Sequence, residues 1–182
     1  MTPTRNPGWY RAERLHRGRV PAEIRTWLLA GGSLTAHVRA CCPGRFGLRI
    51  LRQRVAAPRR DEAALLGMPP GGRALVREIE LCCGTRPLVV ARTIIPLASL
   101  RGRQQRLAGL GRRPLGALLF ADRSARREPY QIARMTLRQA GIARPPRVAS
   151  PVWGRRAVYR LGGAPLLVSE FFLPVLYDTD VD

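Results

Sequence analysis

The chain has 182 residues, a hydrophobic content of 46% and a formal net charge of +20. This length suits one domain with its own core, and the sequence lacks the run of about 18 apolar residues that a membrane-spanning helix needs. Every basic residue is arginine, so the sequence excludes lysine Schiff-base chemistry and lysine-containing phosphate loops. The first residues lack the apolar core of a secretory signal, and we expect a cytoplasmic protein.

The positive charge by itself suggests a polyanionic partner such as nucleic acid. The arginines are scattered without a block or a regular face, however, and aromatic residues that could stack on bases make up 6% of the chain. We therefore expect no specific binding to nucleic acid. The positive field is better suited to drawing in a small anionic substrate.

The N-terminal part of the chain predicts two short helices. Pro21 suits the first position of a helix, and Gly31-Gly32 ends that helix. Ser33 can then cap a second helix over 34–40. We expect three regions in total: a loosely ordered basic segment over 1–20, a single domain over 21–177, and an acidic, solvated tail over 178–182.

Alternation of apolar and polar residues predicts most of the remaining elements. The expected strands are 46–56, 73–83, 87–96, 127–138, 155–162 and 165–173. The expected helical segments are 61–66, 99–110 and 114–120. Hairpins join most of the strands, and the helices do not alternate with them. This order favours an α+β fold in which a single antiparallel sheet carries its helices on one face.

Two charged residues interrupt the apolar faces of predicted strands. Because side chains alternate between the faces of a strand, Arg77 points with Leu75 and Ile79, whereas Glu78 and Glu80 take the solvated face. Glu170 likewise points with Val168 and Phe172, and Arg92 is a second inward cation, on the same face as Val90 and Ile94. A buried charge is costly unless it is paired or binds something. Arg77 and Glu170 either pair inside the core or serve a pocket that needs one cation and one carboxyl group.

The starts of two predicted helices add backbone donors to such a pocket. Leu34 follows the cap residue Ser33, and Leu115 follows Pro114. Amides in the first turn of a helix have no partner within the helix, so they can hold a carboxylate. Together with inward arginines, these positions predict a carboxylate-binding pocket.

The four cysteines form two adjacent pairs, Cys41-Cys42 and Cys82-Cys83. Neighbouring residues on a strand face opposite sides, and the spacing typical of zinc sites is absent. We expect reduced thiols and no metal site.

The chain resembles the chorismate lyase family from Trp27 to Tyr177. The resemblance is carried by four stretches in the right order and at the right spacing, namely Val76–Cys82, Ala91–Pro96, Pro114–Phe120 and Trp153–Pro174. The segment 121–152 matches less well, and we assign no function to it. The resemblance implies conversion of chorismate to 4-hydroxybenzoate and pyruvate, the first committed step of ubiquinone synthesis. It also implies that the enzyme uses no cofactor and has an internal cavity covered by helical flaps. We expect a monomer.

The resemblance also implies roles for individual residues. The carboxylate-binding arginine of the family falls on Arg77, and the carboxyl group near the ring hydroxyl falls on Glu170. The backbone positions that contact the ligand fall on Leu34 and Leu115. We further expect Arg92 to hold the enolpyruvyl carboxylate or to polarise the departing ether oxygen. Arg77, Arg92 and Glu170 are thus the expected catalytic residues.

A non-catalytic sensor of aromatic carboxylates is the main alternative, because effector-binding domains of some bacterial repressors resemble this fold. Such sensors normally follow a helix-turn-helix domain. Residues 1–20 are too short and too rich in proline and arginine to supply one.

Overall fold

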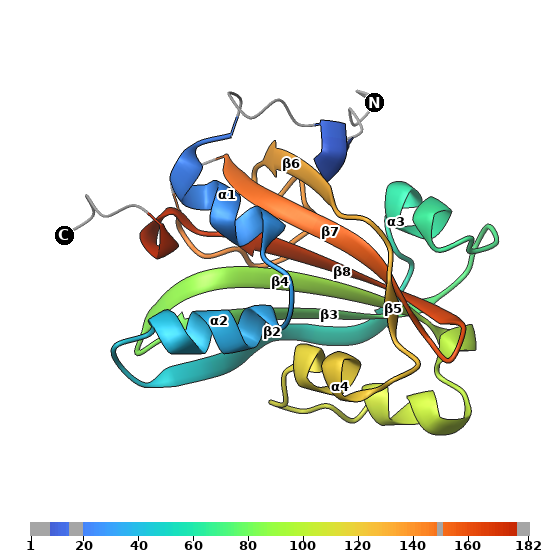
Figure 1. Cartoon of the computed structure of the whole chain (residues 1–182). Coiled ribbons are helices and arrows are strands. Elements are labelled where there is room, and N and C mark those ends of the chain that lie inside the picture. Colours follow the sequence, from blue (N-terminus) through green and yellow to red (C-terminus); the bar gives the residue numbers. More distant parts are fainter. Residues whose placement is uncertain (1–7, 15–19, 149–150, 178–182) are drawn as a thin grey trace.

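A computed structural model describes residues 8–14, 20–148 and 151–177. Within them the chain forms one antiparallel sheet of eight strands (Figure 1), with the order β1-β6-β7-β8-β4-β3-β2 and with β5 paired to β7. The predicted fold class, α+β with a single antiparallel sheet, is confirmed. In chain order the elements are β1 (Tyr10–Arg11), η1 (Ala12–Arg14), α1 (Ala22–Leu29), α2 (Leu34–Cys41), β2 (Phe46–Ala56), α3 (Arg60–Leu65), β3 (Ala74–Cys83), β4 (Arg86–Pro96), η3 (Leu97–Ser99), η4 (Gly102–Leu107), α4 (Leu115–Ala121), β5 (Arg126–Arg127), β6 (Gln131–Met135), β7 (Val152–Leu161), β8 (Ala164–Phe172) and η5 (Pro174–Leu176).

Two tight hairpins bring the central strands together. The turn between β7 and β8 contains Gly162 and Gly163, which both have positive φ angles of 58° and 83°. Such turns need two residues in the left-handed region, where glycine carries no steric penalty. The turn between β3 and β4 has one such residue, Gly84, with φ 58°. Both hairpins match the prediction from sequence.

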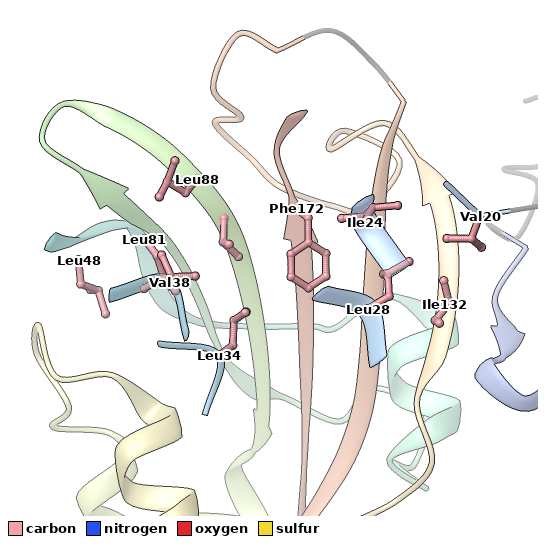
Figure 2. Packing of buried hydrophobic residues seen from close by; sticks show 11 residues of the cluster. Val20, Ile24, Leu28, Leu34, Val38, Leu48, Leu81, Leu88, Ile132 and Phe172 are labelled. Atoms are coloured by element: carbon pink, nitrogen blue, oxygen red, sulfur yellow. The ribbon is translucent and has the colours of Figure 1, made fainter. Parts of the chain in front are cut away.

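Helices α1 and α2 pack on one face of the sheet through an apolar cluster (Figure 2). Ile24 and Leu28 of α1 and Leu34 and Val38 of α2 are buried against strand residues such as Phe172. Helix α4 lies over the same face, where Leu115 and Leu119 join a second cluster. The smaller helix α3 differs from the prediction, because it packs against the opposite face and contributes buried carboxylates there.

Part of the N-terminal segment belongs to the sheet. Tyr10 and Arg11 form β1, which pairs with β6 at the edge, so the expectation of loose order does not describe residues 8–14. Residues 1–7, 15–19 and the acidic tail over 178–182 lie outside the described part of the chain. No helix within the described ranges is long and apolar enough to cross a membrane.

A disulfide ties α2 to the sheet. Cys42 follows the last turn of α2, Cys83 ends β3, and their sulfurs are bonded. The expectation of reduced thiols is therefore wrong for this pair, although Cys41 and Cys82 are free. Only Cys82 and Cys83 are neighbours on a strand, because Cys41 ends α2 and Cys42 caps it. The sequence does not reveal that the turn after α2 brings one member of each pair together.

We predict that Cys42→Ser lowers the free energy of unfolding by about 3–4 kcal/mol, because the bridge closes a long loop in the unfolded chain. Its neighbour Cys41 is exposed and free, so Cys41→Ser is a matched control that leaves stability unchanged. Denaturant unfolding without reductant measures both variants. Equal stability of the two would show that the bridge does not form in solution.

Candidate active site

A partly enclosed cavity of about 50 Å³ lies between the sheet and the first turns of α2 and α4. Its floor comes from the central strands and includes Ile79, Ala91, Thr93, Val168 and Glu170. Its roof comes from the helices and includes Leu34, Thr35, Leu115, Leu119 and Phe120. A cavity that holds one benzene ring measures roughly 150 Å³. The roof must therefore move before an aromatic ring can enter.

The two helix starts meet directly above the cavity. Ser33 caps α2 by accepting a hydrogen bond from the Ala36 amide, and Leu34 is the first helical residue. Leu115 starts α4 after Pro114, which supplies no side-chain cap. A Cβ atom added at Gly116 would lie 3.4 Å from the Ser33 hydroxyl oxygen, which is van der Waals contact, so the two helix starts lie close together. The structure thus brings Leu34, Leu115 and Glu170 to one cavity.

Arg77 lies beside this cavity and has no anionic partner among the residues that the structure describes. The register pairs Arg77 with Thr93 of the cavity floor, and its side chain occupies the same face of the sheet. Arg77 is 2% exposed. It donates hydrogen bonds to the Gln53 side-chain oxygen at 2.7 Å and to the Arg113 carbonyl oxygen at 3.4 Å. Burial disfavours the charged form and lowers the pKa of Arg77 from its usual value.

The other buried arginines of the described chain are paired differently. Arg92, Arg155 and Arg156 are buried as Arg77 is, but each lies within 2.7 Å of a carboxylate oxygen. Arg77 has no carboxylate within 4.0 Å among the residues that the structure describes. This difference identifies Arg77 as the buried cation that can accept an external anion.

Glu170 is held by Arg155, a residue that the sequence analysis assigned no role. The Arg155 Nε donates to the Glu170 carboxylate at 2.7 Å, so Glu170 does not pair with Arg77. Burial, the largest single influence, lowers the pKa of Arg155, but Glu170, Tyr130 and Tyr159 together outweigh burial, so the pKa is raised. Arg155 also donates to the carbonyl oxygens of Trp27 and Ala30 at the end of α1. It thereby joins the carboxyl group of the cavity floor to the segment that leads into α2.

The position of Arg92 contradicts its expected role. Its neighbours Ala91 and Thr93 line the cavity, so Arg92 points to the opposite face. There it donates to Glu62 at 2.7 Å and to Glu78 at 2.5 Å. It therefore cannot hold a group that is bound in the cavity.

The expectation that Glu78 and Glu80 lie on a solvated face of β3 is also wrong. Glu78 and Glu80 are buried, with exposures of 0% and 2%. Helix α3 supplies Glu62 and Asp61, and the segment after β6 supplies the Ala143 amide, which donates to Glu78. The sequence analysis assumed one covered face, whereas these segments cover the second face with a polar layer.

We predict that Arg92→Met lowers the free energy of unfolding by about 3–5 kcal/mol, because it leaves Glu62 and Glu78 buried without their cation. Protein that still folds should bind ligands of the cavity as tightly as the wild type does. Thermal or denaturant unfolding measures the first effect, and calorimetry measures the second. A variant that kept its stability but lost affinity for the ligand would show that Arg92 takes part in ligand binding.

The comparisons with known proteins agree on one family. A family model described as chorismate lyase matches residues 4–182. The chain belongs to the chorismate lyase family. A relative from Methylococcus capsulatus, named as a probable chorismate pyruvate-lyase, is 45% identical over 155 residues, which cover 84% of this chain and 96% of the relative. One from Aromatoleum aromaticum with the same name is 44% identical over 172 residues, covering 91% and 92%.

Solved structures with a similar fold include effector domains of transcriptional regulators. The C-terminal domain of the histidine utilization repressor from Pseudomonas syringae aligns with a TM-score of 0.52, 11% identity, and coverage of 76% of this lyase-family chain and 98% of that domain. The effector domain of PhnF from Mycobacterium smegmatis aligns with a TM-score of 0.51, 17% identity, and coverage of 80% and 90%. At these identities the likeness concerns the fold alone.

Proposed function

We propose that this protein is a chorismate pyruvate-lyase, which converts chorismate to 4-hydroxybenzoate and pyruvate. Family membership supports the reaction. The observation that carries the proposal is the buried Arg77 guanidinium, which lacks a carboxylate partner among the described residues and lies beside this cavity. Chorismate is a dicarboxylate, and a buried cation of this kind selects an anionic ligand.

Arg77 and the amide of Leu115 bind the ring carboxylate in this proposal. A guanidinium matches a carboxylate with two parallel hydrogen bonds. The Arg113 carbonyl contacts Arg77 at 3.4 Å and directly precedes Pro114 at the start of α4. A roof movement that enlarges the cavity can therefore also free the guanidinium. Entry of the ligand then replaces a weak neutral acceptor with a charged one.

Glu170 contacts the hydroxyl group at the opposite end of the ring, and the amide of Leu34 supplies a further donor.

In the reaction, the bond between the ring carbon and the ether oxygen breaks, and the ring becomes aromatic when its C4 proton is lost. The enolpyruvyl methylene carbon gains a proton and becomes the methyl group of pyruvate. The electrons balance without an external oxidant. The protein therefore acts chiefly by binding, orienting and excluding water.

We propose a cytoplasmic, monomeric enzyme at the first committed step of ubiquinone synthesis. The Cys42–Cys83 bridge provides a check on the location, because disulfides are rare in reducing compartments. Thiol labelling of protein from rapidly quenched cells should find these two cysteines reactive if the location is cytoplasmic.

The direct test of the function is incubation of the purified protein with chorismate in excess EDTA and without added cofactor. We expect 4-hydroxybenzoate, followed by chromatography, and pyruvate, followed by a coupled assay, to form in equal amounts. Saturable binding of 4-hydroxybenzoate without turnover would favour a sensor instead. The absence of both turnover and binding would refute the proposal.

We predict that Arg77→Met lowers kcat/KM for chorismate by about 100-fold or more, because a charged hydrogen-bond pair is lost. Its stability should stay equal or rise, since the substitution removes a buried cation that has no carboxylate partner among the described residues. Steady-state kinetics and denaturant unfolding measure the two effects.

Arg92→Met is the matched control for this variant. Arg92 carries the same side chain on the neighbouring strand, but its cation is paired on the other face. We therefore expect Arg92→Met to reduce the stability of the protein and Arg77→Met to reduce its catalytic rate. Normal turnover by Arg77→Met would disprove the assignment of the ring-carboxylate site.

A further inference from the structure

Gln53 contacts the Arg77 guanidinium from outside the cavity lining. The register of β2 and β3 places Gln53 directly opposite Arg77. The side-chain oxygen of Gln53 accepts a hydrogen bond from Arg77 Nη1 at 2.7 Å, and its side-chain nitrogen donates to the Ala108 carbonyl oxygen at 3.0 Å. One side chain therefore contacts both the buried cation and the loop that precedes α4.

The carboxamide of Gln53 suits both contacts, because its oxygen is an acceptor and its nitrogen is a donor. A glutamate at this position would have the same length and shape, but it would place a carboxylate on Arg77. The neutrality of position 53 therefore decides whether the charge of Arg77 is already matched within the fold.

The other charged residues of β3 stand in register with arginines of β2. Glu80 lies opposite Arg49 and forms an ion pair with it, and Glu78 lies opposite Arg52. Cross-strand neighbours of opposite charge stabilise a sheet. Opposite Arg77, the same strand carries an amide where this pattern predicts a carboxylate.

Gln131 and Arg156 form a cross-strand pair of the same kind, but a carboxylate completes it. Gln131 of β6 lies opposite Arg156 of β7 and accepts a hydrogen bond from it at 2.8 Å. Arg156 also donates to the Asp61 carboxylate at 2.6 Å. Arg77 has no carboxylate within 4.0 Å among the described residues. The two pairs therefore differ in the one charge that a ligand of Arg77 could supply.

We propose that Gln53 is a positioning residue that sets the charge selectivity of the site. Its neutral amide holds Arg77 in place without neutralising it, so the cation stays available to the carboxylate of a ligand. The inference rests on the proposed lyase function, which places the ring carboxylate of substrate and product at Arg77. Gln53 acts through Arg77 and does not touch the ligand.

The test compares the binding of 4-hydroxybenzoate and 4-hydroxybenzamide, in which a neutral group of similar size replaces the carboxylate. Calorimetry gives both Kd values. We expect the wild type to bind the carboxylate about tenfold or more tightly, because hydrogen bonds to charged groups are the stronger ones. Gln53→Glu should weaken binding of 4-hydroxybenzoate by about tenfold or more and keep that of 4-hydroxybenzamide within about threefold, since its carboxylate pairs with Arg77. Gln53 is exposed on an edge strand, where such a substitution is compatible with folding.

Gln131→Glu is the matched control. It makes the same substitution opposite a buried arginine that already has a carboxylate partner, so both Kd values should stay within about twofold.

Gln53→Met separates charge from hydrogen bonding, because it removes both contacts of Gln53 and adds no charge. It should keep the preference for 4-hydroxybenzoate over 4-hydroxybenzamide within about threefold of the wild-type value.

Three outcomes would overturn the inference. An equal loss of affinity for both ligands in Gln53→Glu would mean that Gln53 only holds the loop before α4. A loss of preference in Gln53→Met as large as that in Gln53→Glu would mean that the hydrogen bond matters and the neutrality does not. A wild type that turned over chorismate but bound both ligands equally would contradict the selectivity and leave the lyase proposal intact. Conversely, a wild type that showed the preference and its loss in Gln53→Glu, but did not turn over chorismate, would refute the lyase proposal and support the selectivity.

Discussion

The Arg77 guanidinium, buried without a carboxylate partner among the described residues, is the constraint on which the proposed site depends. Moving a cation out of water costs several kcal/mol even after the protein relaxes, and neutral acceptors offset only part of that cost. Gln53 and the Arg113 carbonyl are such acceptors. A carboxylate ligand that binds this guanidinium would offset more of the cost. A carboxylate of the protein beside Arg77 would stabilise the fold. Without one, the guanidinium can instead bind the carboxylate of the substrate.

The sheet separates this functional charge from the structural charges by simple alternation. On β3, Arg77 faces the cavity and Glu78 faces the opposite side, where Arg92 of β4 neutralises it. On β7, Arg155 holds Glu170 on the cavity side, and Arg156 contacts Asp61 of α3 on the other. The back layer fixes the strands and α3 in place. The cavity face can then carry an incompletely satisfied charge without loss of the fold.

The two helices of the cavity roof are in close contact with each other, yet the roof must move before a ligand can enter. The starts of α2 and α4 abut above a cavity that is too small for an aromatic ring. The Cys42–Cys83 bridge anchors the far end of α2 to β3, while Arg155 contacts the carbonyl groups just before Gly31-Gly32. These two attachments hold the C-terminal end of α2 and the segment that precedes it. A movement at the start of α4 would act on Arg113, because Arg113 directly precedes Pro114.

Alternation within single strands was enough to predict the sheet class, the hairpins and the inward direction of Arg77 and Glu170. The same rule, applied to β7, would have found Arg155, which points with Ala157 and Tyr159. It failed for Arg92 and Glu78 because alternation says which residues share a face but not what covers each face. Burial of the second face by α3 is a tertiary property. The bridge between Cys42 and Cys83 depends in the same way on a turn whose path no local pattern specifies.

A crystal structure of the protein with bound 4-hydroxybenzoate tests the central claim most directly. The account predicts that the ligand carboxylate accepts hydrogen bonds from the Arg77 guanidinium and the Leu115 amide, with the ring hydroxyl at Glu170. The Arg113 carbonyl should have moved away from Arg77. A carboxylate bound elsewhere, with Arg77 still bonded to Gln53 and Arg113, would contradict the account.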